Sequence, residues 1–235
     1  MIPYGKWGMS VLMTGLLVIS ATGCQKKDDI SRIQGAGELK VALCEEDEAG
    51  QALCDRVANR LGVTLTYVNV EPGEDGIQLV ENNQADLAVG GIVTGKELDQ
   101  GLSMSEPYLQ ENWYVVTARG DYSDSIEAFR GRMLAVTHAV PDDAFNWTKE
   151  ASDVNFVGVS AEKAQSAIVQ GALQGYVCLE DEALSLADAS SAVQMQDLVG
   201  SEPLSYAMVT RAADRRLGLV IAEQIGQMAK ESEQQ

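Results

Sequence analysis

The chain has little positive charge. Only 17 of its 235 residues are Lys or Arg, against 35 that are Asp or Glu, which leaves a formal net charge of −18. A chain this acidic is repelled by nucleic acid and by anionic lipid headgroups, and no basic stripe along the sequence offsets that repulsion. We therefore expect no nucleic-acid partner.

Residues that commonly hold metal ions are also scarce. The chain has one histidine, His138, and four cysteines, and their spacing matches no zinc-binding pattern. We expect neither a metal site nor a cofactor.

Long apolar runs are absent except near the N-terminus. There Lys6 precedes an apolar run over residues 9–21, which is shorter than the roughly 20 residues that a membrane span needs. The pattern predicts a cleaved signal peptide over residues 1–23. The small residues before Cys24 resemble a bacterial lipobox, which implies that Cys24 carries lipid as the first residue of the mature chain. The alternative is an ordinary signal peptide followed by an incidental cysteine.

The stretch that follows Cys24 is polar. Residues 24–37 show no apolar periodicity, so they predict a flexible tether between the lipid and the folded part. The resemblance implies a lipid-anchored protein of the cell envelope that faces the periplasm or the cell exterior. Gln25, next to the lipidated cysteine, favours the outer membrane if the host is Gram-negative.

Three cysteines remain after processing: Cys44, Cys54 and Cys178. Export permits disulfides, and a Cys44–Cys54 bridge is one prediction, closing a small loop between a strand and a helix. An odd count leaves at least one thiol free or paired between molecules. The alternative is that all three are small buried hydrophobic residues.

Strand and helix patterns alternate along the mature chain. Such alternation predicts βαβ units on largely parallel sheets, an α/β fold. Strands are expected over residues 38–43, 64–70, 86–89, 133–137, 155–160, 176–179 and 204–210. Helices are expected over residues 49–61, 74–83, 124–131, 142–149, 161–170, 181–187 and 212–230.

Residues 82–116 show the most informative order of features. A short apolar strand breaks on Gly90-Gly91, a polar excursion leads to Ser105-Glu-Pro-Tyr108, and a second apolar run follows. This order resembles the amino-acid-binding type of bacterial extracellular solute-binding protein, family 3-like, which feeds ABC transporters. A second likeness is DSIEAFRG over residues 124–131, and the resemblance extends from about residue 38 to residue 230.

The resemblance implies a two-lobe, type 2 periplasmic-binding-protein fold, with two segments crossing between the lobes. Residues 38–117 and 203–235 are expected to form lobe 1, and residues 118–202 lobe 2. Crossings are expected near residues 113–119 and 200–204. It also implies a non-enzymatic protein that captures a small polar solute in the cleft, with an ABC permease as partner.

Two devices by which the family grips an amino-acid carboxylate are missing. Counting places Leu98 or Glu97 where the family has arginine, and Lys96 is the only cation nearby. The expected Gly-Thr turn falls on Ala139-Val140. The family's hairpin after the first strand is replaced by an acidic run, residues 45–48, which either faces a cationic ligand or simply favours a helix start.

These observations predict a binding-protein fold with altered ligand chemistry. Its alternatives are a degenerate scaffold acting in protein–protein interaction or sensing, and a periplasmic enzyme on the same fold. His138 either faces the cleft, where it would titrate near neutral pH, or is structural. The candidate ligand-binding residues are Tyr108, Gly91, Thr94, Glu180, Asp181 and His138.

Overall fold

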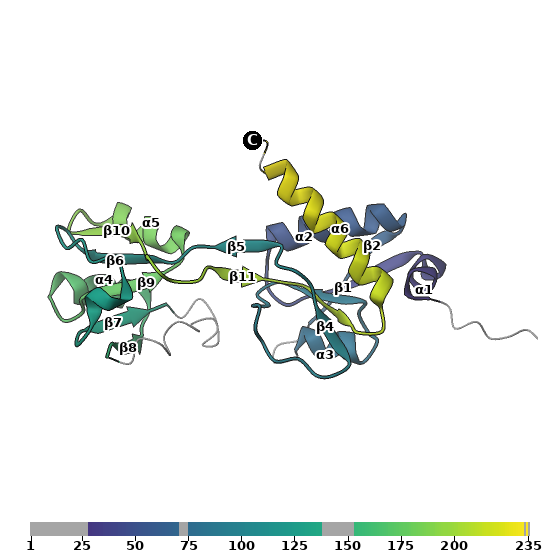
Figure 1. Cartoon of the computed structure of the whole chain (residues 1–235), viewed down its shortest axis with the longest axis horizontal. Helices are drawn as coiled ribbons and strands as arrows, with labels where there is room; N and C mark the ends of the chain where they lie inside the picture. Colours follow the sequence, from purple (N-terminus) through teal and green to yellow (C-terminus); the bar gives the residue numbers. More distant parts are fainter. Residues whose placement is uncertain (1–27, 71–74, 138–152, 233, 235) are drawn as a thin grey trace, which may run out of the picture.

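The computed structural model describes residues 28–70, 75–137, 153–232 and 234. Two lobes lie along the long axis and are joined by two strands (Figure 1). These crossing strands are β5 (Leu109–Glu111) and β11 (Leu204–Tyr206), which pair antiparallel. The predicted two-lobe α/β fold is confirmed.

Lobe 1 is built on a mixed five-stranded sheet in the order β2-β1-β3-β12-β4. The β1–β2 and β1–β3 pairs are parallel, and β12 runs antiparallel to both of its neighbours. Its strands are β1 (Glu38–Leu43), β2 (Thr64–Val68), β3 (Leu87–Val89), β4 (Leu102–Met104) and β12 (Val209–Arg211). Its helices are α1 (Asp29–Ala36), α2 (Glu48–Leu61), α3 (Gly76–Glu81) and α6 (Arg215–Ser232).

Alternate residues of β1 face two different apolar clusters. Leu39 and Val41 pack with residues of α1, α2 and α6, whereas Ala42 packs with α3. Because strand side chains point alternately to opposite faces, the helices cover both faces of the sheet, as parallel strands require.

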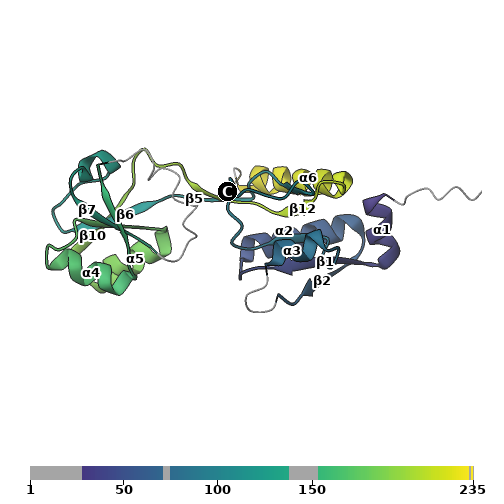
Figure 2. The ribbon, with the colours of Figure 1, turned by 90° about the horizontal axis from the view of Figure 1, so that it is seen from below.

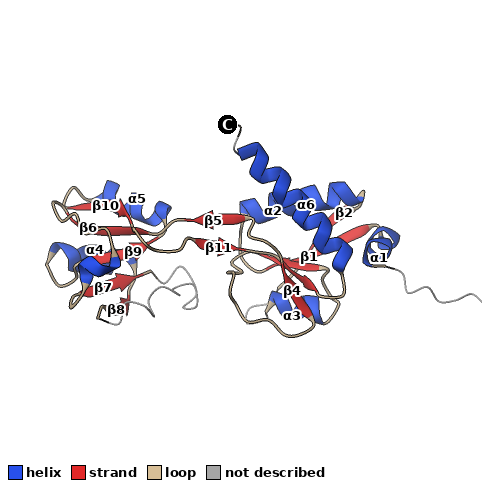
Figure 3. Ribbon diagram, viewed as in Figure 1, coloured by secondary structure: helices blue, strands red, loops and turns tan. Residues whose placement is uncertain are grey.

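Lobe 2 has its own five-stranded sheet, in the order β10-β6-β9-β7-β8. The β7–β8 and β7–β9 pairs are parallel, and β6 runs antiparallel to β9 and β10. Its strands are β6 (Tyr114–Ala118), β7 (Met133–Val136), β8 (Asn155–Gly158), β9 (Gly175–Cys178) and β10 (Val193–Asp197). Its helices are η1 (Ile126–Phe129), α4 (Ala161–Val169) and α5 (Glu180–Ala189), and Figure 3 shows both lobes coloured by element type.

Helix α1 occupies part of the segment predicted to be a flexible tether. It starts where the Asp28 carboxylate accepts a hydrogen bond from the Ser31 amide (3.1 Å). Ile33 is only 1% exposed in the lobe 1 core, and Asp29 accepts from the Leu217 amide of α6 at 2.8 Å. The tether prediction is therefore wrong for residues 29–36. The contacts that order this helix come from residues far along the chain.

Four charged side chains tie α1 to the lobe 1 sheet. Arg32 contacts Asp86 (2.6 Å) and Asp214 (3.1 Å). Arg211 contacts the same two carboxylates, Asp214 at 2.6 Å and Asp86 at 3.3 Å. Asp86 also accepts the Lys40 amide at 3.0 Å. We call Arg32, Asp86, Arg211 and Asp214 the outer ion network.

The first crossing lies earlier than expected. Residues 114–118 form β6 within the lobe 2 sheet, so the chain crosses at β5 and not near residues 113–119. The strand expected over residues 204–210 is divided between the crossing strand β11 and β12 of lobe 1. The helix expected over residues 142–149 lies outside the described residues.

The predicted Cys44–Cys54 disulfide is wrong, because all three described cysteines are free. Cys54 belongs to the cluster between β1 and α2, whereas Cys44 packs against the cluster beneath α3. The two thiols thus lie on opposite faces of the sheet. Burial is the main cause that raises the pKa of Cys44 to about 11 and that of Cys54 to about 12.

Within the described part of the chain, no helix combines the length and the apolar character needed to cross a bilayer.

Candidate functional site

A cavity of about 460 Å³ lies where the two lobes meet the crossing strands. Its walls come from the β1–α2 loop and the start of α2, the turn after β3, both crossing strands, and the start of α5 in lobe 2. The lining residues are Glu45, Glu46, Asp47, Glu48, Ala49, Gly91, Leu109, Glu111, Asp181 and Tyr206.

The β1–α2 loop places its acidic residues at the C-terminal end of the lobe 1 strands. The Cys44 amide still bonds to Val89 of the neighbouring strand (2.8 Å), and α2 starts four residues later. The Asp47 carboxylate caps the helix by accepting from the Gly50 amide at 2.9 Å. Ligand sites of parallel sheets form at this end of the strands.

The Gly90-Gly91 turn allows the loop to approach β3 closely. Both residues have positive φ, +93° and +65°. A Cβ atom at Gly90 would lie 2.3 Å from the Glu45 backbone oxygen, and one at Gly91 would lie 2.6 Å from Glu45 Oε2. Only glycine fits both the backbone conformation and the space, so the turn seats the Glu45 carboxylate in the cavity wall.

Tyr108 lies between the cavity wall and the lobe 1 core. Its hydroxyl donates to the Asp47 carboxylate, and its ring packs against the lobe 1 core. Burial, followed by the hydrogen bond to Asp47, raises the pKa of Tyr108. Tyr108 is not among the described lining residues, whose one aromatic side chain is Tyr206 of β11. Burial and then the nearby Glu111 carboxylate raise the pKa of Tyr206.

The structure brings together two of the six predicted ligand-binding residues, Gly91 and Asp181. Glu180 is exposed at the first position of α5 and is not a lining residue. Thr94 lies beside the hinge, where its amide donates to the Ser205 carbonyl at 2.8 Å. His138 lies outside the described residues.

Four lining residues were missed in the sequence: Ala49, Leu109, Glu111 and Tyr206. The last three lie on β5 and β11. The first crossing was expected a few residues later than β5, and the return crossing a few residues earlier than the end of β11, so these three were not assigned to the cavity.

The cavity is strongly acidic. Six of its described lining residues are carboxylates, and none of the described lining residues is Lys or Arg. Among the described residues, no cation forms an ion pair with any of these six; Lys96, the nearby cation in the sequence, lies 3.8 Å from Asp75 instead. The described residues also contain no group of three or more His, Cys, Asp or Glu arranged to hold a metal ion. The gathered carboxylates favour a positively charged ligand.

Leu98, at the position where the family has arginine, lies in apolar surroundings. Leu98 packs against the cluster that contains Ala88 and Ile92, under the lobe 1 sheet. Its side chain belongs to the fold of lobe 1 and is not among the cavity residues.

Comparison with known proteins gives a family and a set of similar structures. The profile of the bacterial extracellular solute-binding proteins, family 3, matches residues 49–235. No curated protein matches the chain.

Several solved structures share the fold at low sequence identity. An amino acid ABC transporter substrate-binding protein, AbpA of Streptococcus pneumoniae, bound to L-arginine, is 16% identical with a TM-score of 0.58, covering 86% of this chain and 93% of that one. An ancestral cationic amino acid solute-binding protein, AncCDT-1, is 18% identical with a TM-score of 0.61, covering 87% and 95%. The arginine-binding protein ArgBP of T. maritima, in its holo form, is 18% identical with a TM-score of 0.54, covering 84% and 93%.

Proposed function

Because the chain belongs to the bacterial extracellular solute-binding proteins of family 3, we propose that it captures a small cationic solute between its lobes for an ABC transporter. The observation that carries the proposal is the cavity with six carboxylates, which has no Lys or Arg among its described lining residues. Family membership implies an extracytoplasmic protein that binds small solutes.

A cation also explains how the lobes would close. Five of the six carboxylates belong to lobe 1 and the crossing strands, while Asp181 stands on the lobe 2 side. Bringing these groups together without a counter-charge raises their repulsion. A bound cation lowers that repulsion in the closed state more than in the open state. Binding then shifts the population toward closure, which is a hinge motion about β5 and β11.

The proposed solute differs from an ordinary amino acid in one respect. An α-carboxylate is best held by a bidentate guanidinium, and Leu98 supplies none. Similar proteins are described as binding arginine or cationic amino acids, whose side-chain charge this cavity also suits. We therefore expect a diamine to bind at least as well as L-arginine, and an acidic amino acid not to bind.

The test is titration calorimetry and thermal unfolding with 1,4-diaminobutane, L-arginine and L-glutamate. A ligand at 100 times its Kd stabilises the protein by about 2.7 kcal/mol. The variant Glu46→Gln/Glu48→Gln should weaken diamine binding by roughly tenfold or more, since each lost charge contributes on the order of 1 kcal/mol. The control Glu127→Gln/Glu162→Gln changes two exposed acids of lobe 2 and should bind like the parent.

A flat response to all three compounds would overturn solute capture and favour the scaffold that binds another protein. Preference for L-glutamate would overturn the cationic class while keeping the solute site. Equal loss in both double variants would mean that overall charge, and not the cavity, governs binding.

We also propose that Cys24 is lipidated, so that the protein is held at the cell envelope, with the outer membrane favoured if the host is Gram-negative. The small residues before this cysteine support the proposal. Growth with an alkyne-tagged palmitate should label the parent and not Cys24→Ala, which is then expected in the soluble fraction.

Catalysis is the second candidate, because AncCDT-1 is also described as a precursor of cyclohexadienyl dehydratase. It has less support. The ionisable groups among the described lining residues are carboxylates and one tyrosine, and the family is mainly non-enzymatic. Unchanged solute after prolonged incubation is the expected result.

A further inference from the structure

We propose that the far end of lobe 1 rests on a bilayer containing anionic phospholipid, with the first turns of α6 against the headgroups. The proposal depends on the lipid at Cys24 proposed above. The contact surface is formed by Arg215, Arg216 and Leu219, all exposed, which we call the outer ridge. Figures 1 and 2 show that α1 and the start of α6 lie together at the end of lobe 1 remote from lobe 2.

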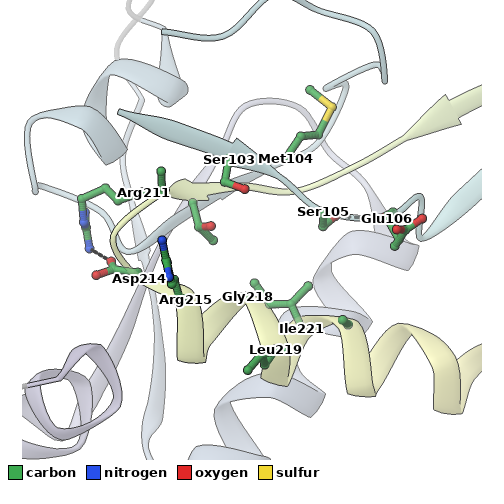
Figure 4. A pocket seen from close by; sticks show the side chains of 13 residues that line it. Ser103, Met104, Ser105, Glu106, Arg211, Asp214, Arg215, Gly218, Leu219 and Ile221 are labelled. Atoms are coloured by element: carbon green, nitrogen blue, oxygen red, sulfur yellow. Dashed lines mark hydrogen bonds and ion pairs between the residues drawn. The ribbon is translucent and has the colours of Figure 1, made fainter. Parts of the chain in front are cut away.

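The outer ridge separates two grooves. One, of about 410 Å³, lies between β4, β12 and α6, and Arg215 and Leu219 are among its lining residues (Figure 4). The other, of about 290 Å³, lies between α1, α2 and α6 and includes Arg216 and Leu219. Leu219 lines both grooves, so it stands at the crest between them.

The smaller groove combines guanidinium groups with an apolar floor. Arg60 and Arg216 line it together with Ile30, Leu61 and Val220. Guanidinium binds phosphate oxygens well, and aliphatic side chains suit the glycerol and upper acyl region of a phospholipid. The chemistry of this groove therefore matches a phospholipid headgroup.

The fold itself gains little from the outer ridge. Cations in the first turn of a helix face the positive end of its dipole, which is unfavourable, and α6 has no acidic residue there. Arg215 forms no ion pair with a described residue, and Arg216 pairs only with exposed Asp28 (3.1 Å), a kind of pair that contributes about 0–1 kcal/mol. Leu219 is 71% exposed. An arrangement that weakens the local structure suggests a partner outside the chain.

The position of the chain exit selects the bilayer as that partner. Asp28 caps α1 and is the residue that Arg216 contacts. Asp29 lies five residues after Cys24 in the sequence. A chain of that length spans at most about 18 Å even when fully extended. A lipid on Cys24 thus holds the outer ridge close to the membrane surface. The cavity between the lobes lies toward the other end of lobe 1, where this contact leaves it open.

Opposing charges limit the strength of the contact. Glu106 lines the larger groove, and Glu223 pairs with Arg60 at 3.5 Å. The whole chain is acidic, so the outer ridge would not hold it on a membrane alone. The lipid supplies the attachment by raising the local concentration, and the outer ridge determines which end of the protein faces the bilayer.

The test uses the full lipidated protein reconstituted in vesicles of phosphatidylcholine, with and without phosphatidylglycerol. An environment-sensitive fluorophore is attached to Leu219→Cys and, as a matched position, to Tyr122→Cys, which is 77% exposed in lobe 2. Protein without an introduced cysteine reports any labelling of the native thiols. We expect a shift of emission to shorter wavelength at position 219 on phosphatidylglycerol vesicles, and none at position 122.

Two charge variants test whether the arginines of the outer ridge cause the shift. Arg215→Gln/Arg216→Gln should abolish the shift at position 219, whereas Arg130→Gln/Lys163→Gln, which removes two exposed cations of lobe 2, should leave it. Equal emission at both positions, or a shift that survives the outer-ridge variant, would overturn the proposal. The mass of the reconstituted protein tests the lipid anchor separately from the bilayer contact. A mass without lipid overturns the anchor, and with it the bilayer contact, which depends on that anchor.

Discussion

Charged residues at the two ends of lobe 1 find their counter-charges in different places. At the end remote from lobe 2, the carboxylates of Asp86 and Asp214 are each held by Arg32 and Arg211. At the cleft end, Glu45, Glu46 and Glu48 have no cation partner among the described residues. The first set stabilises the fold, whereas the second leaves a concentration of negative charge that no described cation offsets.

Removal of Asp86 should have the largest effect on stability. Its side chain is 7% exposed, and Asp86→Ala would leave Arg211 without one of its two carboxylates inside the lobe. We expect unfolding in urea to show a loss of about 3–5 kcal/mol, as for one partner of a buried pair. Glu38→Ala removes a carboxylate from an exposed pair with Lys40 (3.3 Å), so it should cost at most about 1 kcal/mol. Equal losses of stability in the two variants would show that the outer ion network contributes no more than an exposed ion pair.

Asp47 is the acidic cavity residue that the fold does engage, since Tyr108 donates to it and it caps α2. Tyr108→Phe should therefore lower the free energy of unfolding by about 1.5–3 kcal/mol, the range for a hydrogen bond to a charged group. Tyr122→Phe, at an exposed position of lobe 2, should change it negligibly. If the two variants behave alike, Asp47 belongs with the unpaired carboxylates.

The smallest stability change is expected from Glu45→Gln/Glu46→Gln/Glu48→Gln. Relief of repulsion among the three groups opposes the loss of a favourable charge in the first turn of α2, so the free energy of unfolding should stay within about 1 kcal/mol of the parent. Binding of 1,4-diaminobutane should be lost in the same variant. A strong destabilisation would contradict the division between structural and ligand-directed charge.

Salt offers a further distinction between the two ends. Exposed charges are screened within about 10 Å at 0.1 M ionic strength, so diamine affinity should fall steadily as salt rises. The cost of Asp86→Ala should change much less, because Asp86 is buried and the Arg211 side chain is only 11% exposed. Calorimetry and urea unfolding at matched salt concentrations measure the two effects.

Local patterns in the sequence were enough to predict most of the regular elements. The helix over residues 48–61 could be read from its apolar spacing and from Gly62, which ends it with φ +71°. The Gly90-Gly91 turn and the acidic run beside it were also visible, because backbone conformation and charge are properties of neighbouring residues.

Other features depend on contacts that no local pattern contains. Helix α1 is ordered by Asp86, Asp214 and Leu217, which lie between 54 and 188 positions away along the chain. Residues 114–118 form an apolar strand whether they cross between lobes or join the second sheet, and the error of a few residues at this crossing hid Glu111. Tyr206 was hidden because the return crossing was expected near residues 200–204. The Cys44–Cys54 prediction failed because spacing does not tell on which face of a sheet each side chain lies.

The α/β class, the resemblance to a two-lobe family and the excess of acidic residues can all be recognised in the amino-acid order alone. Which acidic residues meet in one cavity, and which are neutralised by arginine, depends on the folded arrangement. Charge interactions depend on separation and burial in space, and folding brings Asp181 of one lobe to the same cavity as Glu45 of the other.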